Sequence, residues 1–189
     1  MRYAKDYRKN IFCLEGEWLK DLRKKRSIVD ALIFLEKNST VKYIHRNCNT
    51  VEEFANRFVE YKKAIYKDYS ICYLAYHGKP NGIMMGKNIL TLDEIAEISS
   101  GQLKNKIIHF GSCSSLKLDK RHLKKFLEKT EALCISGFTI DVDFIPSSVF
   151  DLLYFEICQR YKDITCIERD MKRYYGKLVK ELSFRMVYL

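Results

Sequence analysis

The sequence has few of the residues that interrupt regular structure, and it has no segment suited to a membrane. Two prolines and eight glycines occur in 189 residues, so no flexible linker is evident. No apolar run approaches the roughly 18 residues that a spanning helix needs. The polar start, MRYAKDYRKN, has no apolar stretch of the kind that a signal peptide contains. We expect a single domain over 1–189, with a core over about 10–161 and a C-terminal helical extension over about 162–189.

Cysteine pairs at metal-binding or redox spacing are also missing. The seven cysteines include no C-x-x-C pair, so neither a zinc ribbon nor a thioredoxin motif is predicted. Most of them lie within apolar segments, where cysteine behaves as a small hydrophobic residue. The pattern predicts a reduced, soluble, cytoplasmic protein, with no metal and no cofactor.

Positively charged residues are in excess over negatively charged ones. Lys and Arg number 34 against 24 Asp and Glu, a net charge of +10. An acidic partner, nucleic acid or a membrane surface is compatible with that surplus. However, the densest run is only the four residues Arg23-Lys24-Lys25-Arg26, too short for a basic arm. We therefore favour a solvated basic face, and expect neither nucleic acid nor a membrane as partner.

Short apolar runs alternate with amphipathic segments along the whole chain. This alternation is typical of an α/β fold in which a mostly parallel sheet is flanked by helices. Strands are predicted over 10–14, 41–45, 70–76, 107–110, 132–136 and 184–188, a hairpin over 83–90, and helices over 28–37, 51–66, 92–98, 120–129, 147–161 and 164–180.

Several helix starts carry capping residues. Thr50 and Thr91 each precede a glutamate by three residues, the spacing of a capping box, and Ser27 and Asp119 stand before two further helices. The helix after Thr50 is predicted to bury one stripe of residues, namely Val51, Phe54, Phe58 and Ile65.

Two stretches, SICYLAYHG (70–78) and KIIHFGSCSS (106–115), share one form. Each is an apolar run that stops at small residues, and the first ends in His77-Gly78 while the second presents Cys113. The carboxyl ends of strands in an open α/β sheet are where ligands bind. If the two strands are neighbours, we expect His77 and Cys113 to form a nucleophile and base pair, with the N–H groups of Gly78 and Cys113 as oxyanion donors.

An inert role is the main alternative for these residues. A lone cysteine is most often a core residue, and a lone histidine after a strand is usually a satisfied polar group. Among the other histidines, His109 is predicted to be buried, His45 ends a different strand, and His122 lies on a helix.

The two motifs resemble those of the caspase-like (clan CD) cysteine peptidases. YLAYHG at 73–78 is similar to the histidine motif of that group, and IIHFGSCSS at 107–115 is similar to its cysteine motif, most of all to the bacterial CHAT form. The caspase pattern Gln-Ala-Cys-Arg-Gly is not matched. The segment EALCISGFTIDVDFIPSSVF at 131–150 resembles the one that follows the cysteine in separase and CHAT proteins. The whole chain, including IFCLEGEW, also looks like a bacterial family of this kind.

The resemblance implies a caspase-haemoglobinase three-layer sandwich and a hydrolase that uses a Cys-His dyad. Cys113 would be the nucleophile, and His77 would protonate the leaving amine of a protein or peptide substrate. In the arginine-specific relatives an acidic group lines the pocket for the residue before the cut. Asp141 or Asp143 would take that place here, with Glu15 or Glu17 adding to it, so cleavage after a basic residue is predicted.

Two other functions stay open at this point. The chain is also compatible with a non-catalytic caspase-like module that binds a protein partner in a bacterial defence or signalling system. Nucleic-acid binding through the +10 surface is the third and weakest hypothesis, because the surplus is spread too evenly to indicate a groove. Edge strands in related folds pair into dimers, so a homodimer is a further possibility.

Overall fold

The computed structural model describes residues 7–21 and 23–189, and its centre is a six-stranded sheet. The strand order is β2-β1-β3-β7-β8-β9; the first five strands run parallel, and β9 lies antiparallel to β8 at the edge. The strands are β1 (Ile11–Glu15), β2 (Tyr43–Asn47), β3 (Ile71–Ala75), β7 (Ile107–Phe110), β8 (Cys134–Phe138) and β9 (Phe184–Val187). The α/β fold with a mostly parallel sheet is as predicted.

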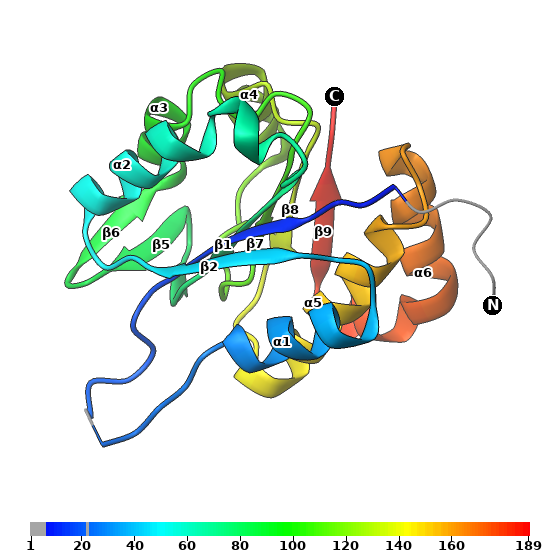
Figure 1. Cartoon of the computed structure of the whole chain (residues 1–189), viewed down its shortest axis with the longest axis horizontal. Helices are drawn as coiled ribbons and strands as arrows, with labels where there is room; N and C mark the ends of the chain where they lie inside the picture. Colours follow the sequence, from blue (N-terminus) through cyan, green and yellow to red (C-terminus); the bar gives the residue numbers. More distant parts are fainter. Residues whose placement is uncertain (1–6, 22) are drawn as a thin grey trace.

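Helices cover both faces of this sheet (Figure 1). One face carries α2 (Val51–Tyr61), α3 (Leu92–Ile98) and α4 (Lys120–Thr130), and the other carries α1 (Val29–Asn38), α5 (Phe144–Cys158) and α6 (Ile164–Glu181). Alternate strand residues therefore enter different cores: Phe12 and Leu14 pack beneath α2, whereas Ile11 and Cys13 pack beneath α1. Because both faces are buried, the central strands are apolar throughout.

A small second sheet follows the histidine motif. The strands β4 (Gly78–Lys79), β5 (Gly82–Met85) and β6 (Asn88–Thr91) pair antiparallel, so the hairpin predicted around Gly86 is confirmed. Thr91 then caps α3 with a full capping box, also as predicted. Residues after 162 supply α6 and the edge strand β9, so the end of the chain completes the main sheet.

The predicted extent of α2 is wrong. The helix ends at Tyr61 and a short 3-10 turn, η1 (Ala64–Tyr66), follows, because Lys63 adopts an extended conformation. Tyr61 is buried and its hydroxyl donates to the Tyr69 carbonyl at 2.5 Å, which turns the chain back toward β3. Of the predicted stripe, Phe54 and Phe58 are buried, whereas Val51 and Ile65 are 41% and 75% exposed.

Helix α5 begins three residues earlier than predicted. Asp143 is its N-cap residue, and Pro146 lies within the first turn, where a missing N–H costs no hydrogen bond. This start brings Phe144 within ring contact of Trp18, with 5.0 Å between the ring centroids. Within the described residues, no helix is both long and apolar enough to cross a membrane.

Candidate active site at the carboxyl edge of the sheet

His77 and Cys113 follow neighbouring strands at equivalent positions. Strand β3 pairs with β7 so that Leu74 lies opposite Phe110, and His77 and Cys113 each stand three residues beyond this pair. The two loops touch, because a Cβ atom built on Gly78 would lie 1.8 Å from the Cys113 carbonyl oxygen. Only glycine fits at position 78 without moving the cysteine loop.

The serines around Cys113 hold its loop in place. The Ser112 hydroxyl donates to the Leu74 carbonyl at the end of β3, and the Ser115 hydroxyl donates to the Gly82 carbonyl in β5 at 2.9 Å. Ser114 has a positive φ of 52°, and its N–H donates to the Ile140 carbonyl. The small residues of GSCSS therefore connect the loop to three neighbouring segments.

The Cys113 thiol is half-buried and contacts the backbone of Val142. Its Sγ lies 3.3 Å from the Val142 carbonyl oxygen, to which the thiol donates, and 3.4 Å from the Val142 nitrogen, whose N–H points at the sulfur. An N–H donor at sulfur stabilises a thiolate when one forms. Both residues are described, and no hydrogen bond joins this thiol to the His77 ring. In enzymes without bound substrate, hydrogen bonds between catalytic groups are often long or poorly aligned.

The exposed His77 ring is oriented by Trp18, in the loop after β1. His77 Nε2 lies 2.7 Å from the Trp18 carbonyl oxygen, and the two rings meet edge to face at 5.1 Å. A carbonyl oxygen only accepts hydrogen bonds, so Nε2 carries the proton and Nδ1 of the neutral ring is the free base. The contact bridges β1 and β3, where the strand order reverses and a ligand crevice is expected.

Glu15, predicted to line a substrate pocket, anchors the Trp18 loop. Its side chain is buried, and its oxygens contact four groups: the indole N–H of Trp18 and the amide of Ile28 at Oε1, and the hydroxyl of Ser27 and Nε2 of His45 at Oε2. These contacts occupy the acceptor sites of the carboxylate. Burial on its own raises the pKa of Glu15, but the four donors outweigh it and hold the pKa below its ordinary value.

Two backbone N–H groups of the His77 and Cys113 loops make no backbone hydrogen bond within the described residues. Met84 donates to the His77 carbonyl at 2.7 Å, so the next pair, Gly78 with Ile83, is a non-hydrogen-bonded pair of the antiparallel ladder. The Gly78 N–H therefore points away from β5. The Cys113 N–H has no backbone acceptor within the described residues. These are the two donors predicted from the sequence.

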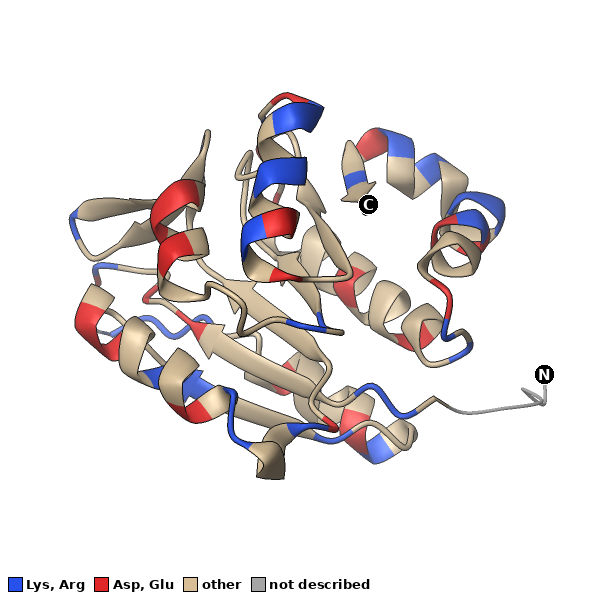
Figure 2. Cartoon of the chain, turned by 90° about the horizontal axis from the view of Figure 1, so that it is seen from above, with Lys and Arg blue, Asp and Glu red and all other residues tan. Residues whose placement is uncertain are grey.

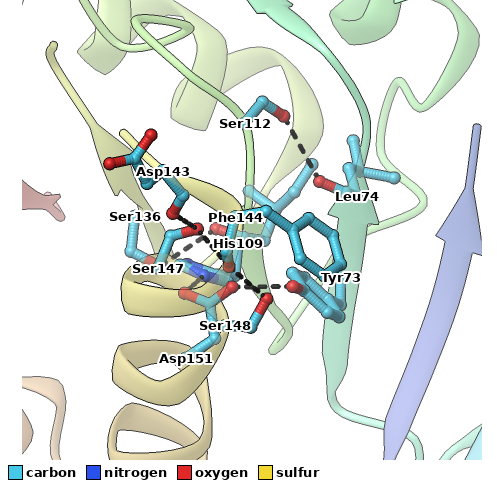
Figure 3. Close-up of polar contacts among 11 residues, drawn as sticks. Tyr73, Leu74, His109, Ser112, Ser136, Asp143, Phe144, Ser147, Ser148 and Asp151 are labelled. Carbon is cyan, nitrogen blue, oxygen red and sulfur yellow. Dashed lines mark hydrogen bonds and ion pairs between the residues drawn. The ribbon is translucent and has the colours of Figure 1, made fainter. Parts of the chain in front are cut away.

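The two candidate acidic residues differ in their surroundings. Asp141 is exposed and accepts a short hydrogen bond from the Ser114 hydroxyl, so one of its oxygens is used to hold the cysteine loop. Asp143 is exposed at the start of α5 and makes no side-chain capping bond. Figure 3 shows its carboxylate directed away from the helix. Asp143 is therefore the better placed of the two to receive a cationic group.

A fully buried polar network lies beneath the site (Figure 3). His109 Nδ1 is 3.0 Å from the Ser136 hydroxyl and its Nε2 is 2.8 Å from Asp151 on α5, while the Tyr73 hydroxyl donates to the same carboxylate at 2.6 Å. Ser136, His109 and Asp151 have the contacts of a hydrolytic triad, but they are at most 1% exposed and no substrate reaches them. The network joins β3, β7 and β8 to α5 and so supports Asp143 and Phe144.

The other cysteines have different surroundings from Cys113. Cys13, Cys48, Cys72, Cys134 and Cys158 are buried, and burial raises the pKa of Cys72 and of Cys158 to about 12. Such thiols stay protonated and unreactive at neutral pH. Cys166, on α6, is the second half-buried cysteine of the described chain and lies 53 residues after Cys113 in the sequence.

A hollow of about 410 Å³ adjoins Trp18 on the side of β1 and β2. The cations Lys24, Lys25 and Arg26 line it together with Glu17, and the Arg26 guanidinium lies 5.2 Å from the centre of the Phe144 ring. Glu17 and three cations together do not select a basic side chain.

Sequence reasoning missed three features of the site. The backbone of Val142 touches the thiol, the Trp18 carbonyl orients His77, and His109 pairs with Asp151. The first two are main-chain groups that any residue type supplies, so no residue pattern indicates them. The third had a visible signal, because a histidine within an apolar strand requires a buried polar partner.

These features define a class of protein. It has an α/β three-layer fold and carries a cysteine and a histidine at the carboxyl edge of its parallel sheet. Within it, the chain belongs to a family of unknown function, DUF6642, whose model matches residues 8–188. No curated protein matches the chain.

Proposed function

We propose that this protein is a cysteine endopeptidase of the caspase-like, CHAT type that uses Cys113 and His77 and cuts after a basic residue. The observation that carries the proposal is the contact of Gly78 with the Cys113 carbonyl, which sets a histidine and a half-buried thiol on adjoining loops. Nucleophile and base on adjoining strand ends are what thiol acyl transfer requires. The resemblance of the two motifs to those of clan CD supports the same chemistry.

In the proposed first step, Nδ1 of His77 takes the proton of the Cys113 thiol, and the thiolate attacks the carbonyl carbon of the scissile peptide bond. The carbonyl oxygen becomes an oxyanion that accepts hydrogen bonds from the N–H groups of Gly78 and Cys113. The imidazolium, held through its Nε2–H on the Trp18 carbonyl, then passes its Nδ1 proton to the leaving amine. The C–N bond breaks and a thioester remains on Cys113.

In the second step, water replaces the departed amine. Neutral His77 accepts a proton from this water at Nδ1, the hydroxide attacks the thioester carbonyl, and the C–S bond breaks. The proton returns to sulfur as the acid leaves. The peptide and one water molecule are the only reactants consumed, and the enzyme is regenerated.

The preference for a basic residue is the finer part of the proposal, and it rests on Asp143. Its exposed carboxylate belongs to the residue that directly follows Val142, whose backbone contacts the thiol, so a substrate side chain beside the cut lies within reach of it. Arg or Lys would pair with it through charge-assisted hydrogen bonds. Asp141 supports the loop through Ser114, and Glu15 contributes by holding Trp18.

The test is cleavage of fluorogenic peptides that end in Arg or Lys, with peptides that end in Asp or Leu for comparison. Release of fluorophore by the wild-type protein, its loss in Cys113→Ala, and its retention in Cys166→Ala are expected. Asp143→Asn should raise KM for the basic peptides. Equal background for wild type and Cys113→Ala, with and without candidate activators, would refute the peptidase.

A non-catalytic module that binds a protein partner is the second candidate. One observation favours it: Ile145 and Val149 stand one helical turn apart on α5 and are 73% and 51% exposed beside the site, and Ile140 is exposed just before them. Clustered exposed apolar residues mark interaction surfaces. Iodoacetamide separates the two candidates, because a catalytic Cys113 reacts faster than the half-buried Cys166, whereas an inert thiol does not.

A further inference from the structure

A lysine-rich hollow lies at the opposite edge of the sheet from His77 and Cys113. It has a volume of about 400 Å³ and opens where η1 precedes β3 and where the loop 101–106 leads into β7. Its lining contains no carboxylate and five lysines, namely Lys62, Lys63, Lys67, Lys104 and Lys106. Lys and Arg also occur on other helices and loops (Figure 2), and two further hollows hold three and four of them, but each of these also contains a glutamate. The lining of five lysines without a carboxylate distinguishes this hollow.

Lys106 forms the floor of the hollow. It is 8% exposed, and its ammonium lies 4.0 Å from the centre of the Tyr61 ring and donates to the Tyr69 carbonyl at 3.0 Å. Burial lowers the pKa of Lys106, because it disfavours the charged ammonium. A bound anion would stabilise that positive charge, so Lys106 favours an anionic ligand. None of its described partners is a carboxylate.

The other four lysines are exposed at the rim. Lys63 and Lys104 pair with Glu60 and Glu131, at 2.7 Å and 3.7 Å, in exposed ion pairs. Such pairs contribute little, about 0–1 kcal/mol, so a multivalent anion displaces them readily. Lys62 and Lys67 make no ion pair within the described chain.

The walls of the hollow are held before any ligand arrives. Gly101 and Leu103 donate to the Lys129 and Thr130 carbonyls at the end of α4, and Lys106 donates to the Leu103 carbonyl at 2.9 Å. On the other side, Lys67 donates through its N–H to the Ala64 carbonyl and closes η1. A site with a fixed backbone loses little entropy when it binds a ligand.

We propose that this hollow binds a compact polyphosphate group, such as the one that a nucleoside triphosphate carries. Lysine ammonium groups act as point charges for phosphate, and five of them around one hollow match several negative charges on one small ligand. The volume is within the range of small-molecule sites, about 300–1,000 Å³. The site is separate from the peptidase proposal, and its test measures binding alone.

A single-stranded nucleic acid fits the hollow less well. Proteins that hold single strands combine a long basic groove with exposed aromatic rings on which bases stack. Here Tyr61, which adjoins Lys62 and Lys63 in sequence, is 1% exposed and offers no ring face, because Phe12 stacks on one side and Lys106 lies over the other. The lysines surround one bounded hollow.

The experiment is a calorimetric titration of the full chain with sodium tripolyphosphate and, in separate arms, with ATP and a 12-nucleotide single-stranded DNA. The variant is Lys62→Glu/Lys67→Glu, and the matched control is Lys124→Glu/Lys125→Glu on α4, which changes the net charge equally at exposed positions. Lys106→Met, which keeps the length and apolar stem of the side chain, probes the floor.

We expect saturable binding of tripolyphosphate and ATP that weakens with added salt. Lys62→Glu/Lys67→Glu should weaken it by about tenfold or more, which corresponds to about 1.4 kcal/mol, and Lys106→Met should also weaken it. The control should stay near the wild-type value. Absence of saturable tripolyphosphate binding, or equal loss in the α4 control, would overturn the proposal. Tighter binding of the oligonucleotide than of tripolyphosphate would also overturn it, in favour of nucleic acid.

Discussion

His77 Nε2 lies 2.7 Å from the carbonyl oxygen of Trp18, so the histidine of the candidate dyad is held by the loop after β1. The carbonyl has no proton to give, and the neutral ring must therefore be the Nε2–H tautomer. Histidine nitrogens observed by two-dimensional 15N NMR should show this tautomer for the neutral ring of His77. A neutral ring protonated at Nδ1 would contradict the arrangement, because the base that faces substrate would then be lost.

The close approach of Gly78 to Cys113 predicts a large effect of one methyl group. In Gly78→Ala the new Cβ would lie 1.8 Å from the Cys113 carbonyl oxygen, so the two loops must separate. Because displacements near 1 Å cost about 10²-fold in rate, we expect peptide cleavage to fall by that order while the circular dichroism spectrum stays native.

Gly176→Ala is the matched control for that substitution. Gly176 lies in α6 with no atom within 4 Å of an added Cβ. Alanine there should leave cleavage unchanged and stabilise the fold by about 0.4–1 kcal/mol. Equal activity of the two variants would show that the Gly78 contact does not position the site.

Glu15 should make the stability of the fold depend on pH. Its pKa is depressed in the folded state, so its contribution is present above the ordinary glutamate pKa and is lost as pH falls through the folded-state value. Glu15→Gln removes the negative charge of the carboxylate that accepts hydrogen bonds from four donors. This substitution should lower the free energy of unfolding at pH 7 by about 1–3 kcal/mol. Urea unfolding of both proteins measures this difference, which should shrink toward acid pH.

Glu17→Gln is the corresponding control, because Glu17 is exposed in the same loop. Its free energy of unfolding should differ little from wild type at either pH. If the difference between wild type and Glu15→Gln stayed constant as pH fell, the carboxylate charge would not be the source of the stability.

The buried network under the site should be structural. Asp151→Asn replaces an acceptor of both Tyr73 and His109 with an amide whose NH2 group faces one of these donors. We expect a loss of about 1–3 kcal/mol in the free energy of unfolding. Asp143→Asn, at the exposed start of the same helix, should cost less than about 0.5 kcal/mol. An Asp151→Asn protein as stable as wild type would argue against this role.

Local patterns in the sequence determined most of the fold. Apolar runs such as Ile107–Phe110 are strands because both of their faces are buried, and Thr91 begins a helix because its hydroxyl and Glu94 satisfy free backbone donors. The predicted positions of the helix ends were less accurate. Nothing local at Lys63 indicates that α2 has stopped, since the cause is the burial of Tyr61 and its bond to the Tyr69 carbonyl.

The candidate dyad was indicated by the sequence, because strand, glycine and reactive side chain are adjacent in both motifs. That β3 and β7 are neighbours was decided only by the tertiary structure, and so was the placing of His77 and Cys113 at equivalent positions. The roles of Trp18 and Val142 depend on main-chain carbonyl and N–H groups, which no residue type identifies. Five lysines from two separate segments, 62–67 and 104–106, meet in one hollow because the turns before β3 and β7 lie side by side. Residue types thus determined which chemistry is present, and strand order decided which groups meet.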